Sequence, residues 1–149
     1  DLGAGTGSVS IECARMCPFG EVYAVEYKPE ALDILEQNKT RFQTKNLQII
    51  AGRAEEQVQH LPVPDCVFLG GSSGAAKQLV AGLRQLRQPV RLVASAVTME
   101  TQAELFPLLQ ELPQFEVVQL AVGCGKTVGN YHVLEGNHPV LLFSCMTKE

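Results

Sequence analysis

The sequence predicts one α/β domain whose mostly parallel, doubly wound β-sheet is closed by an antiparallel pair of strands at its C-terminal end. Two observations carry this prediction. Short β-branched runs alternate with helical patterns over the first two thirds of the chain, and two further strand-like runs follow without a helix between them. Strands separated by helices of about ten residues form parallel units, whereas strands without a crossover pair antiparallel. The 149 residues contain no repeat or linker, so we expect a single domain over residues 1–149.

Six runs rich in β-branched or apolar residues are expected to form the strands. The parallel ones are residues 21–26, 47–51, 66–69 and 90–96. Residues 115–122 and 139–143 are expected to form the antiparallel closing pair, with the glycine-rich segment 123–138 as their connection.

Four helices are expected, one before the first of these strands over residues 9–16 and three between them over residues 29–38, 75–86 and 100–112. The last pattern is the clearest, because leucines recur at the i, i+3, i+4 and i+7 positions of one helical face from Leu105 to Leu112. Pro113 then ends that pattern. Ser8 or Thr6 is expected to cap the N-terminus of the first helix.

The chain opens with DLGAGTG, which is typical of a turn from a strand into a helix, yet the preceding strand is missing. In a doubly wound sheet that strand is central, and its loss would leave neighbouring strands unpaired. We therefore expect the natural protein to continue upstream of Asp1, with a short N-terminal portion or a fused second domain.

Composition argues against several classes of function. Twelve Lys and Arg residues against 16 Asp and Glu give a net charge of −4, the wrong sign for a general affinity for nucleic-acid phosphates. No apolar run approaches the roughly 18 residues that cross a bilayer. The five cysteines include no Cys-x-x-Cys pair, so we expect neither a disulfide framework nor a metal site. We expect a cytoplasmic protein without a nucleic-acid or membrane partner.

The opening turn has the composition of a nucleotide pocket. Gly3, Gly5 and Gly7 let the backbone bend sharply and approach a ligand closely. Their G-x-G-x-G spacing differs from the dinucleotide fingerprint G-x-G-x-x-G, which makes a pyrophosphate ligand the weaker interpretation. Glu26 ends the next strand and can accept hydrogen bonds from both hydroxyls of a ribose, and Asp1 adds a second carboxylate. Two carboxylates suit a ligand with an ammonium and a sulfonium group, such as S-adenosylmethionine.

Two further loops follow strands at the same carboxyl edge of the predicted sheet, where ligands of open α/β sheets bind. Gly52, Arg53 and Ala54 can frame an adenine base with backbone groups, although an ordinary helix start explains them equally well. The run Gly70-Gly71-Ser72-Ser73-Gly74 leaves room for a large methyl acceptor beside the donor. A flexible turn is its alternative interpretation.

Together these residues resemble a class I S-adenosylmethionine-dependent methyltransferase, and more narrowly the decarboxylating C15-methyltransferases of corrin biosynthesis. This family includes the cobalt-precorrin C15 enzymes and the matching domain of precorrin-6Y C5,15-methyltransferases. The resemblance runs through DLGAGTGSVSIECA (1–14), VYAVEYKPEALDILEQN (22–38), VFLGGSSG (67–74) and VGCGKTVGNYHVLEGNHPVLLF (122–143). The last two stretches are the specific ones. One departure is Ser73, where the family typically has glycine.

The resemblance implies a Rossmann-like fold and methylation of a precorrin at C15 with loss of an acetate carboxyl group, in cobalamin biosynthesis. The cofactor would be S-adenosylmethionine, and the candidate contacts to it are Asp1, Gly3, Gly5, Gly7, Glu26, Gly52, Arg53, Ala54 and Gly70. The tetrapyrrole would lie against residues 70–74 and 123–132, with Ser72, Tyr131 and His132 as candidate catalytic residues. The resemblance also implies a homo-oligomer such as a tetramer.

The carboxylates of such a substrate require a local basic patch. The candidates are Lys77, Arg84, Arg87, Arg91 and Lys126. By contrast, attack of an electron-rich ring carbon on a sulfonium needs accurate positioning more than a strong base, so no catalytic triad is expected.

Other interpretations stay open. Another class I methyltransferase, acting on tRNA or on a small metabolite, would share the first two stretches. A non-catalytic nucleoside-binding domain or a nicotinamide-dependent oxidoreductase would also use an acidic residue such as Glu26 to hold a ribose. Only the glycine spacing and the antiparallel closing pair argue against the oxidoreductase.

Overall fold

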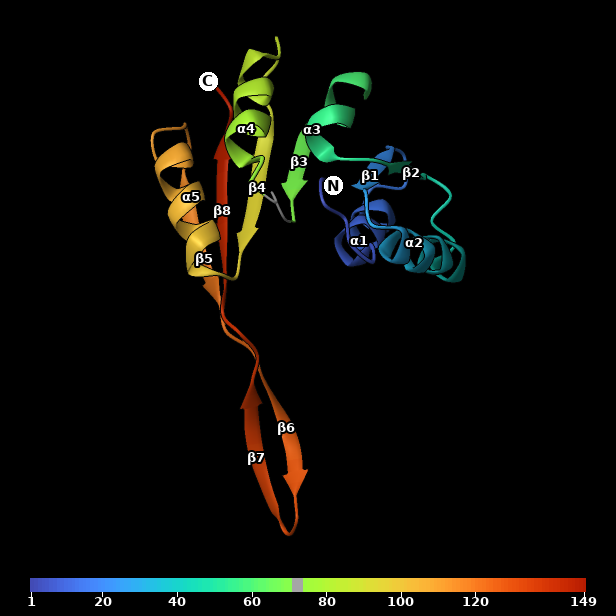
Figure 1. Ribbon diagram of the computed structural model, residues 1–149, viewed down its shortest axis with the longest axis vertical. Coiled ribbons are helices and arrows are strands. Elements are labelled where there is room, and N and C mark those ends of the chain that lie inside the picture. The colour runs from blue at the N-terminus through green and yellow to red at the C-terminus, as the bar shows by residue number, and fades with distance from the viewer. Residues whose placement is uncertain (71–73) are drawn as a thin grey trace.

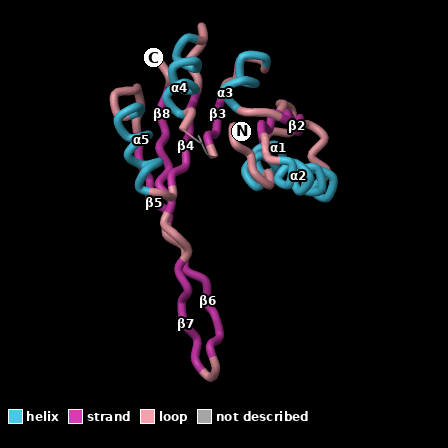
Figure 2. The backbone as a smooth tube through the Cα atoms, in the orientation of Figure 1, coloured by secondary structure: helices cyan, strands magenta, loops and turns pink. Residues whose placement is uncertain are grey.

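The computed structural model describes residues 1–70 and 74–149. Its elements follow one another along the chain as Figures 1 and 2 show. They are α1 (Ser8–Met16), β1 (Val22–Glu26), α2 (Pro29–Phe42), β2 (Leu47–Ala51), α3 (Ala54–Gln57), the 3₁₀ turn η1 (Val58–His60), β3 (Cys66–Leu69), α4 (Ala76–Gln85), β4 (Arg91–Ala96), α5 (Met99–Leu109), β5 (Glu116–Leu120), β6 (Gly123–Val128), β7 (Tyr131–Gly136) and β8 (Val140–Met146).

The central sheet consists of two parts that Leu2 joins. β1 pairs with β2 and β3 pairs with β4, both in parallel, whereas β8 lies antiparallel between β4 and β5. Leu2 forms parallel bridges to Val25 of β1 and Leu69 of β3. The order across the sheet is therefore β2, β1, Leu2, β3, β4, β8, β5. The predicted mostly parallel sheet with an antiparallel C-terminal closure is confirmed.

Helices cover both faces of the sheet because successive residues of a strand point to opposite sides. In β1, Ala24 belongs to a core with Ile11 of α1 and Leu35 of α2. The next residue, Val25, belongs to the larger core, which contains Leu79 of α4 and other buried residues of α4 and α5. Strand β1 thus marks the boundary between two apolar layers.

Two helix ends differ from the predictions. The expectation that Ser8 or Thr6 caps α1 is wrong, because the N-cap is Gly7 and no side chain caps this helix. Gly7 takes the left-handed conformation with φ of 86°, which starts the helix directly at Ser8. Helix α5 ends at Leu109, and Leu112 packs in the core from the turn that follows.

A β-hairpin projects from the domain where the sequence analysis expected only a connection. β6 and β7 pair antiparallel in a regular register, and the ribbon extends away from the helices (Figure 1). All twelve residues of its two strands are exposed. Gly129 and Asn130 form the two-residue turn, and Gly129 has a φ of 60°. A Gly-Asn pair between two strand-like runs is a known hairpin signal, so the sequence did contain the information.

None of the helices in the described part of the chain is long and apolar enough to cross a membrane. The same residues contain no group of three or more His, Cys, Asp or Glu side chains that could hold a metal ion.

Asn46 ties the end of α1 to the start of β2. Its side-chain nitrogen lies 3.0, 2.9 and 3.0 Å from the carbonyl oxygens of Ala14, Cys17 and Gly20. In Asn46→Ala the Ala14 and Gly20 carbonyl groups would lose this donor, whereas the Cys17 carbonyl keeps the Gly20 N–H, and we expect the free energy of unfolding to fall by about 1–3 kcal/mol. Urea denaturation measures this loss. Asn38→Ala, which removes one exposed hydrogen bond to the Thr6 carbonyl, should cost less, and equal losses would contradict the prediction.

Candidate functional site

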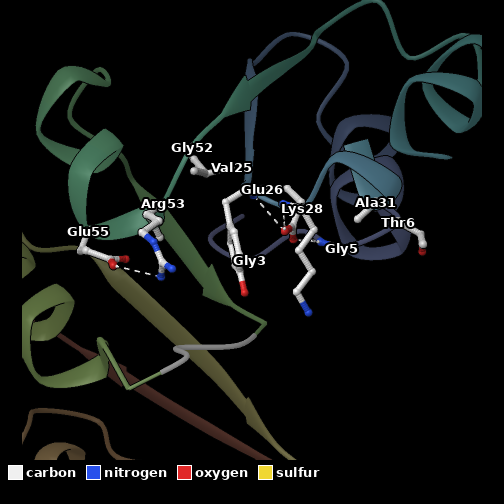
Figure 3. Close-up of a pocket in the computed structure, with 12 residues that line it drawn as sticks. Gly3, Gly5, Thr6, Val25, Glu26, Lys28, Ala31, Gly52, Arg53 and Glu55 are labelled. Atoms are coloured by element: carbon white, nitrogen blue, oxygen red, sulfur yellow. Dashed lines mark hydrogen bonds and ion pairs between the residues drawn. The ribbon is translucent and has the colours of Figure 1, made fainter. Parts of the chain in front are cut away.

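A pocket of about 320 Å³ opens beside the first turn of the chain, at the carboxyl ends of β1 and β2 (Figure 3). It brings together the glycine turn, the end of β1 and the loop after β2, which are all regions that the sequence analysis selected. The lining residues are Gly3, Gly5, Thr6, Val25, Glu26, Tyr27, Lys28, Ala31, Gly52, Arg53, Ala54 and Glu55.

The three glycines of the turn have different tasks. Gly3, Gly5 and Gly7 have φ angles of 77°, 57° and 86°, in the left-handed region that disfavours side chains. A Cβ atom on Gly5 would meet no atom within 4 Å and would therefore occupy open space at the pocket. A Cβ atom on Gly7 would lie 2.0 Å from Cδ1 of Leu35. Gly5 thus keeps the pocket open, whereas Gly7 lets α1 pack against α2 and does not line the pocket.

Glu26 organises the turn through its carboxylate. Oε2 accepts a hydrogen bond from the Gly5 N–H at 2.8 Å, and Oε1 accepts from the Tyr27 and Lys28 N–H groups, both at 2.9 Å. Three of the roughly four acceptor positions of a carboxylate are therefore in use. These backbone donors leave acceptor capacity at Glu26, and the expectation that this carboxylate holds a ribose stays a prediction.

Glu26 is 5% exposed, yet it remains ionised. Burial alone would raise the pKa of its carboxyl group. The backbone hydrogen bonds from Lys28, Gly5 and Tyr27, together with the charge of Lys28, outweigh burial and leave the pKa below its ordinary value. The site therefore offers a negative charge at neutral pH.

Asp1 directly precedes the turn but is not among the residues that line the pocket. Its Oδ2 accepts a hydrogen bond from the Ser10 hydroxyl. Its Oδ1 is buried and has no hydrogen-bond partner among the described residues. A buried carboxylate oxygen without a donor is costly, which suits it to a ligand that carries a cationic amino group.

The loop after β2 forms the opposite wall of the pocket. The Gly52 N–H donates to the Glu26 carbonyl oxygen at 2.9 Å, which fastens the loop to the end of β1. The guanidinium carbon of Arg53 lies 4.8 Å from the centre of the Tyr27 ring, and the Lys28 ammonium lies 5.8 Å from the same centre. Sequence reasoning missed Tyr27 and Lys28. They could have been found from their position directly after Glu26, at the carboxyl edge where ligands of such sheets bind.

This geometry agrees with comparisons to known proteins. A family model described as "Precorrin methyltransferase domain" matches residues 1–147. The chain belongs to this family. The resemblance stated from the sequence is thereby confirmed.

Relatives of this precorrin methyltransferase domain match it over nearly its whole length. The cobalt-precorrin-6B C(15)-methyltransferase (decarboxylating) of Salmonella typhimurium is 34% identical, and the match covers 100% of this chain and 78% of that protein. The crystal structure of precorrin-6Y C5,15-methyltransferase from Geobacter metallireducens has a TM-score of 0.84 at 31% identity, covering 100% of this chain and 78% of the other. The precorrin 8W decarboxylase of Methanobacterium thermoautotrophicum has a TM-score of 0.85 at 27% identity, covering 97% and 78%.

Several predicted site residues of the precorrin methyltransferase domain lie outside the pocket. Tyr131 and His132 are on the projecting hairpin, and as neighbours on β7 they point to opposite faces. Gly70 lies beneath the turn, where its N–H donates to the Leu2 carbonyl oxygen at 3.0 Å. A Cβ atom there would lie 2.9 Å from the carbonyl oxygen of Gly3. Ser72 lies outside the described residues.

Three residues of the predicted basic patch lie apart from the pocket among the described residues: Arg84, Arg91 and Lys126. Arg84 is in the last turn of α4 and Arg91 begins β4, so both lie at the sheet edge opposite the pocket. Arg91 donates instead to the Gln114 side chain at 2.7 Å. Lys126 pairs with Glu135 on the hairpin at 2.9 Å. Among the residues that line the pocket, the basic ones are Lys28 and Arg53.

Proposed function

We propose that this domain transfers a methyl group from S-adenosylmethionine to C15 of a precorrin, with loss of an acetate carboxyl group. The observation that carries the proposal is the pair of carboxylates, Asp1 and Glu26, around a left-handed glycine turn in a precorrin methyltransferase domain. The names of the Salmonella and Geobacter relatives support the substrate class.

The residues of the site fit this cofactor. The unpartnered Oδ1 of Asp1 would take the ammonium group of the amino-acid part. The open acceptor capacity of Glu26 would take a ribose hydroxyl, and the open space next to Gly5 would hold part of the sugar. The loop with Gly52 would then face the base. When bound, the cofactor supplies a methyl group on a positively charged sulfur.

The proposed reaction depends mainly on how the protein positions the methyl donor and the acceptor carbon. The attacking ring carbon forms the new C–C bond with the methyl carbon as the C–S bond breaks. The ring carbon, methyl carbon and sulfur must therefore lie in line, with the ring carbon roughly 3–3.5 Å from the methyl carbon. Decarboxylation leaves an electron pair that the conjugated macrocycle can accept. Ser72 stays a candidate catalytic residue, as the family resemblance implies. A cytoplasmic location also stays a prediction.

Calorimetric titration followed by turnover tests the proposal. We expect S-adenosylhomocysteine to bind and the nicotinamide cofactors not to bind. With S-adenosylmethionine and a cobalt-free or cobalt-containing precorrin, the product should gain one methyl group and lose one carbon dioxide by mass spectrometry. Binding of a nicotinamide cofactor in place of S-adenosylhomocysteine would contradict the proposal. Failure to methylate both precorrins would also contradict it.

We also propose that the chain self-associates through the hairpin. Val128 and Tyr131 pair directly and share one face with Val133, and these side chains are 53%, 76% and 44% exposed. The same face carries the Lys126–Glu135 ion pair, so its charges complement those of a second copy related by a twofold axis. An isolated two-stranded hairpin is marginally stable in water, which favours a partner. A second copy would also bring Tyr131 and His132 near another chain.

Sedimentation velocity tests this contact. Tyr131→Asp is expected to shift the protein to a smaller assembly, because it places a charge within the apolar face. Val63→Asp adds the same charge at a residue that is 55% exposed elsewhere on the molecule, and it should leave the assembly unchanged. Identical sedimentation of Tyr131→Asp and the unmodified chain would contradict the prediction.

A further inference from the structure

Arg53 has a side-chain arrangement that a loop offering only backbone contacts would not need. Its guanidinium carbon lies 4.8 Å from the centre of the Tyr27 ring, within the range of a cation–π contact. Both residues line the pocket, and Tyr27 is 40% exposed. Figure 3 shows the Arg53 side chain beside Gly52 and Glu55 at the pocket, so the guanidinium stands at the pocket wall next to the Tyr27 ring.

The backbone on both sides of this pair is fixed. The Tyr27 N–H donates to Glu26 Oε1 at 2.9 Å, and the Gly52 N–H donates to the Glu26 carbonyl oxygen at 2.9 Å. Gly52 has a φ of 144°, and a Cβ atom there would lie 2.6 Å from Nε2 of Gln57. Only glycine allows this path directly before Arg53. Glu26 thus sets the positions of Tyr27 and of the loop that carries Arg53.

We infer that Arg53, supported by the Tyr27 ring, is the positioning residue on which the purine base of the cofactor stacks. This inference rests on the proposed function, which places the ribose at Glu26. Tyr27 directly follows Glu26 and Arg53 lines the same pocket, so a base joined to that ribose would meet these two side chains. A guanidinium group is planar, delocalised and weakly hydrated, and nucleobases stack on it. The sequence analysis assigned the base to backbone groups of residues 52–54, whereas the geometry points to a side chain.

The ion pair of Arg53 does not compete strongly with this task. Its Nη1 lies 3.9 Å from Oε1 of Glu55, at the outer limit of such a contact. The Arg53 side chain is 51% exposed, so the pair contributes little binding energy of its own. The guanidinium is free to adjust to a base while the Tyr27 ring stays in place.

Calorimetric titrations of Arg53→Ala and Arg53→Lys with S-adenosylhomocysteine and with adenosine test the inference. We expect Arg53→Ala to bind both ligands about tenfold more weakly. Arg53→Lys should lose most of the same affinity, because lysine keeps the charge but lacks the plane. Arg41→Ala is the matched control, since Arg41 lies 5.5 Å from the Phe42 ring on α2, outside the pocket lining, and should bind normally.

Tyrosine fluorescence gives an independent readout, because the chain has three tyrosines and no tryptophan. Adenosine should change the emission of the unmodified chain, and Tyr27→Leu should abolish this change. Unchanged affinity in Arg53→Ala would overturn the inference, as would full affinity in Arg53→Lys. A loss confined to precorrin binding would also overturn it and assign Arg53 to the substrate. Failure of the unmodified chain to bind S-adenosylhomocysteine would instead overturn the proposed function itself.

Discussion

Glu26→Ala is expected to weaken the binding of S-adenosylhomocysteine by about 2–4 kcal/mol, or roughly 30- to 1000-fold in Kd. The variant loses the acceptor for a ribose hydroxyl. It also releases the N–H groups of Gly5, Tyr27 and Lys28, which the carboxylate now holds in place. The pocket would therefore lose both a contact and its shape. Isothermal titration calorimetry at neutral pH measures the effect.

Glu21→Ala is the matched control for this experiment. Glu21 precedes β1 at the end far from the pocket, and its carboxylate accepts only from the exposed Tyr23 hydroxyl among the described contacts. We expect its affinity to be unchanged. A folded Glu26→Ala variant, shown by its circular dichroism spectrum, that binds as tightly as this control would remove Glu26 from the site.

Gly7→Ala is expected to lower the free energy of unfolding by about 2–4 kcal/mol. The new side chain would sit on a backbone with φ of 86° and would overlap Cδ1 of Leu35, which is fully buried. Relief of this overlap requires α1 to move away from α2. Chemical denaturation followed by circular dichroism measures the loss of stability.

Gly5→Ala separates the structural role of the turn from its binding role. Its φ of 57° imposes a strain of about 1 kcal/mol, but the new methyl group meets no protein atom within 4 Å. We expect a smaller loss of stability than in Gly7→Ala and a larger loss of S-adenosylhomocysteine affinity, because the methyl group enters the pocket space. The reverse ranking of the two variants in either measurement would refute this division of tasks.

Much of the sheet could be predicted because strand and helix periods are local properties of the sequence. β2 and β3 occupy the predicted residues 47–51 and 66–69, and the antiparallel pairing of β5 with β8 followed from the absence of a helix between them. The position of the pocket could also be predicted from the sequence, since the glycine turn and Glu26 lie at the same edge of the sheet. Local periodicity therefore located the side of the sheet that carries the site.

The features that could not be predicted depend on which residues lie close together in the folded chain. Arg84 follows the glycine loop closely in the chain, but α4 rises about 1.5 Å per residue and carries it to the opposite edge of the sheet. Tyr131 and His132 belong to a ribbon whose direction only the fold determines. The contact between Arg53 and Tyr27 joins residues from two loops, and no spacing rule connects them.

The three amide hydrogen bonds to Glu26 have a kinetic consequence. They join the glycine turn and the start of α2 to one carboxylate, so we expect these segments to become ordered as the chain folds. If the proposed function holds, we expect the nucleoside to bind without a slow rearrangement of the turn after encounter. The rate at which the demethylated nucleoside is replaced by S-adenosylmethionine would then be set by its dissociation. The residence time of this product would therefore limit the exchange.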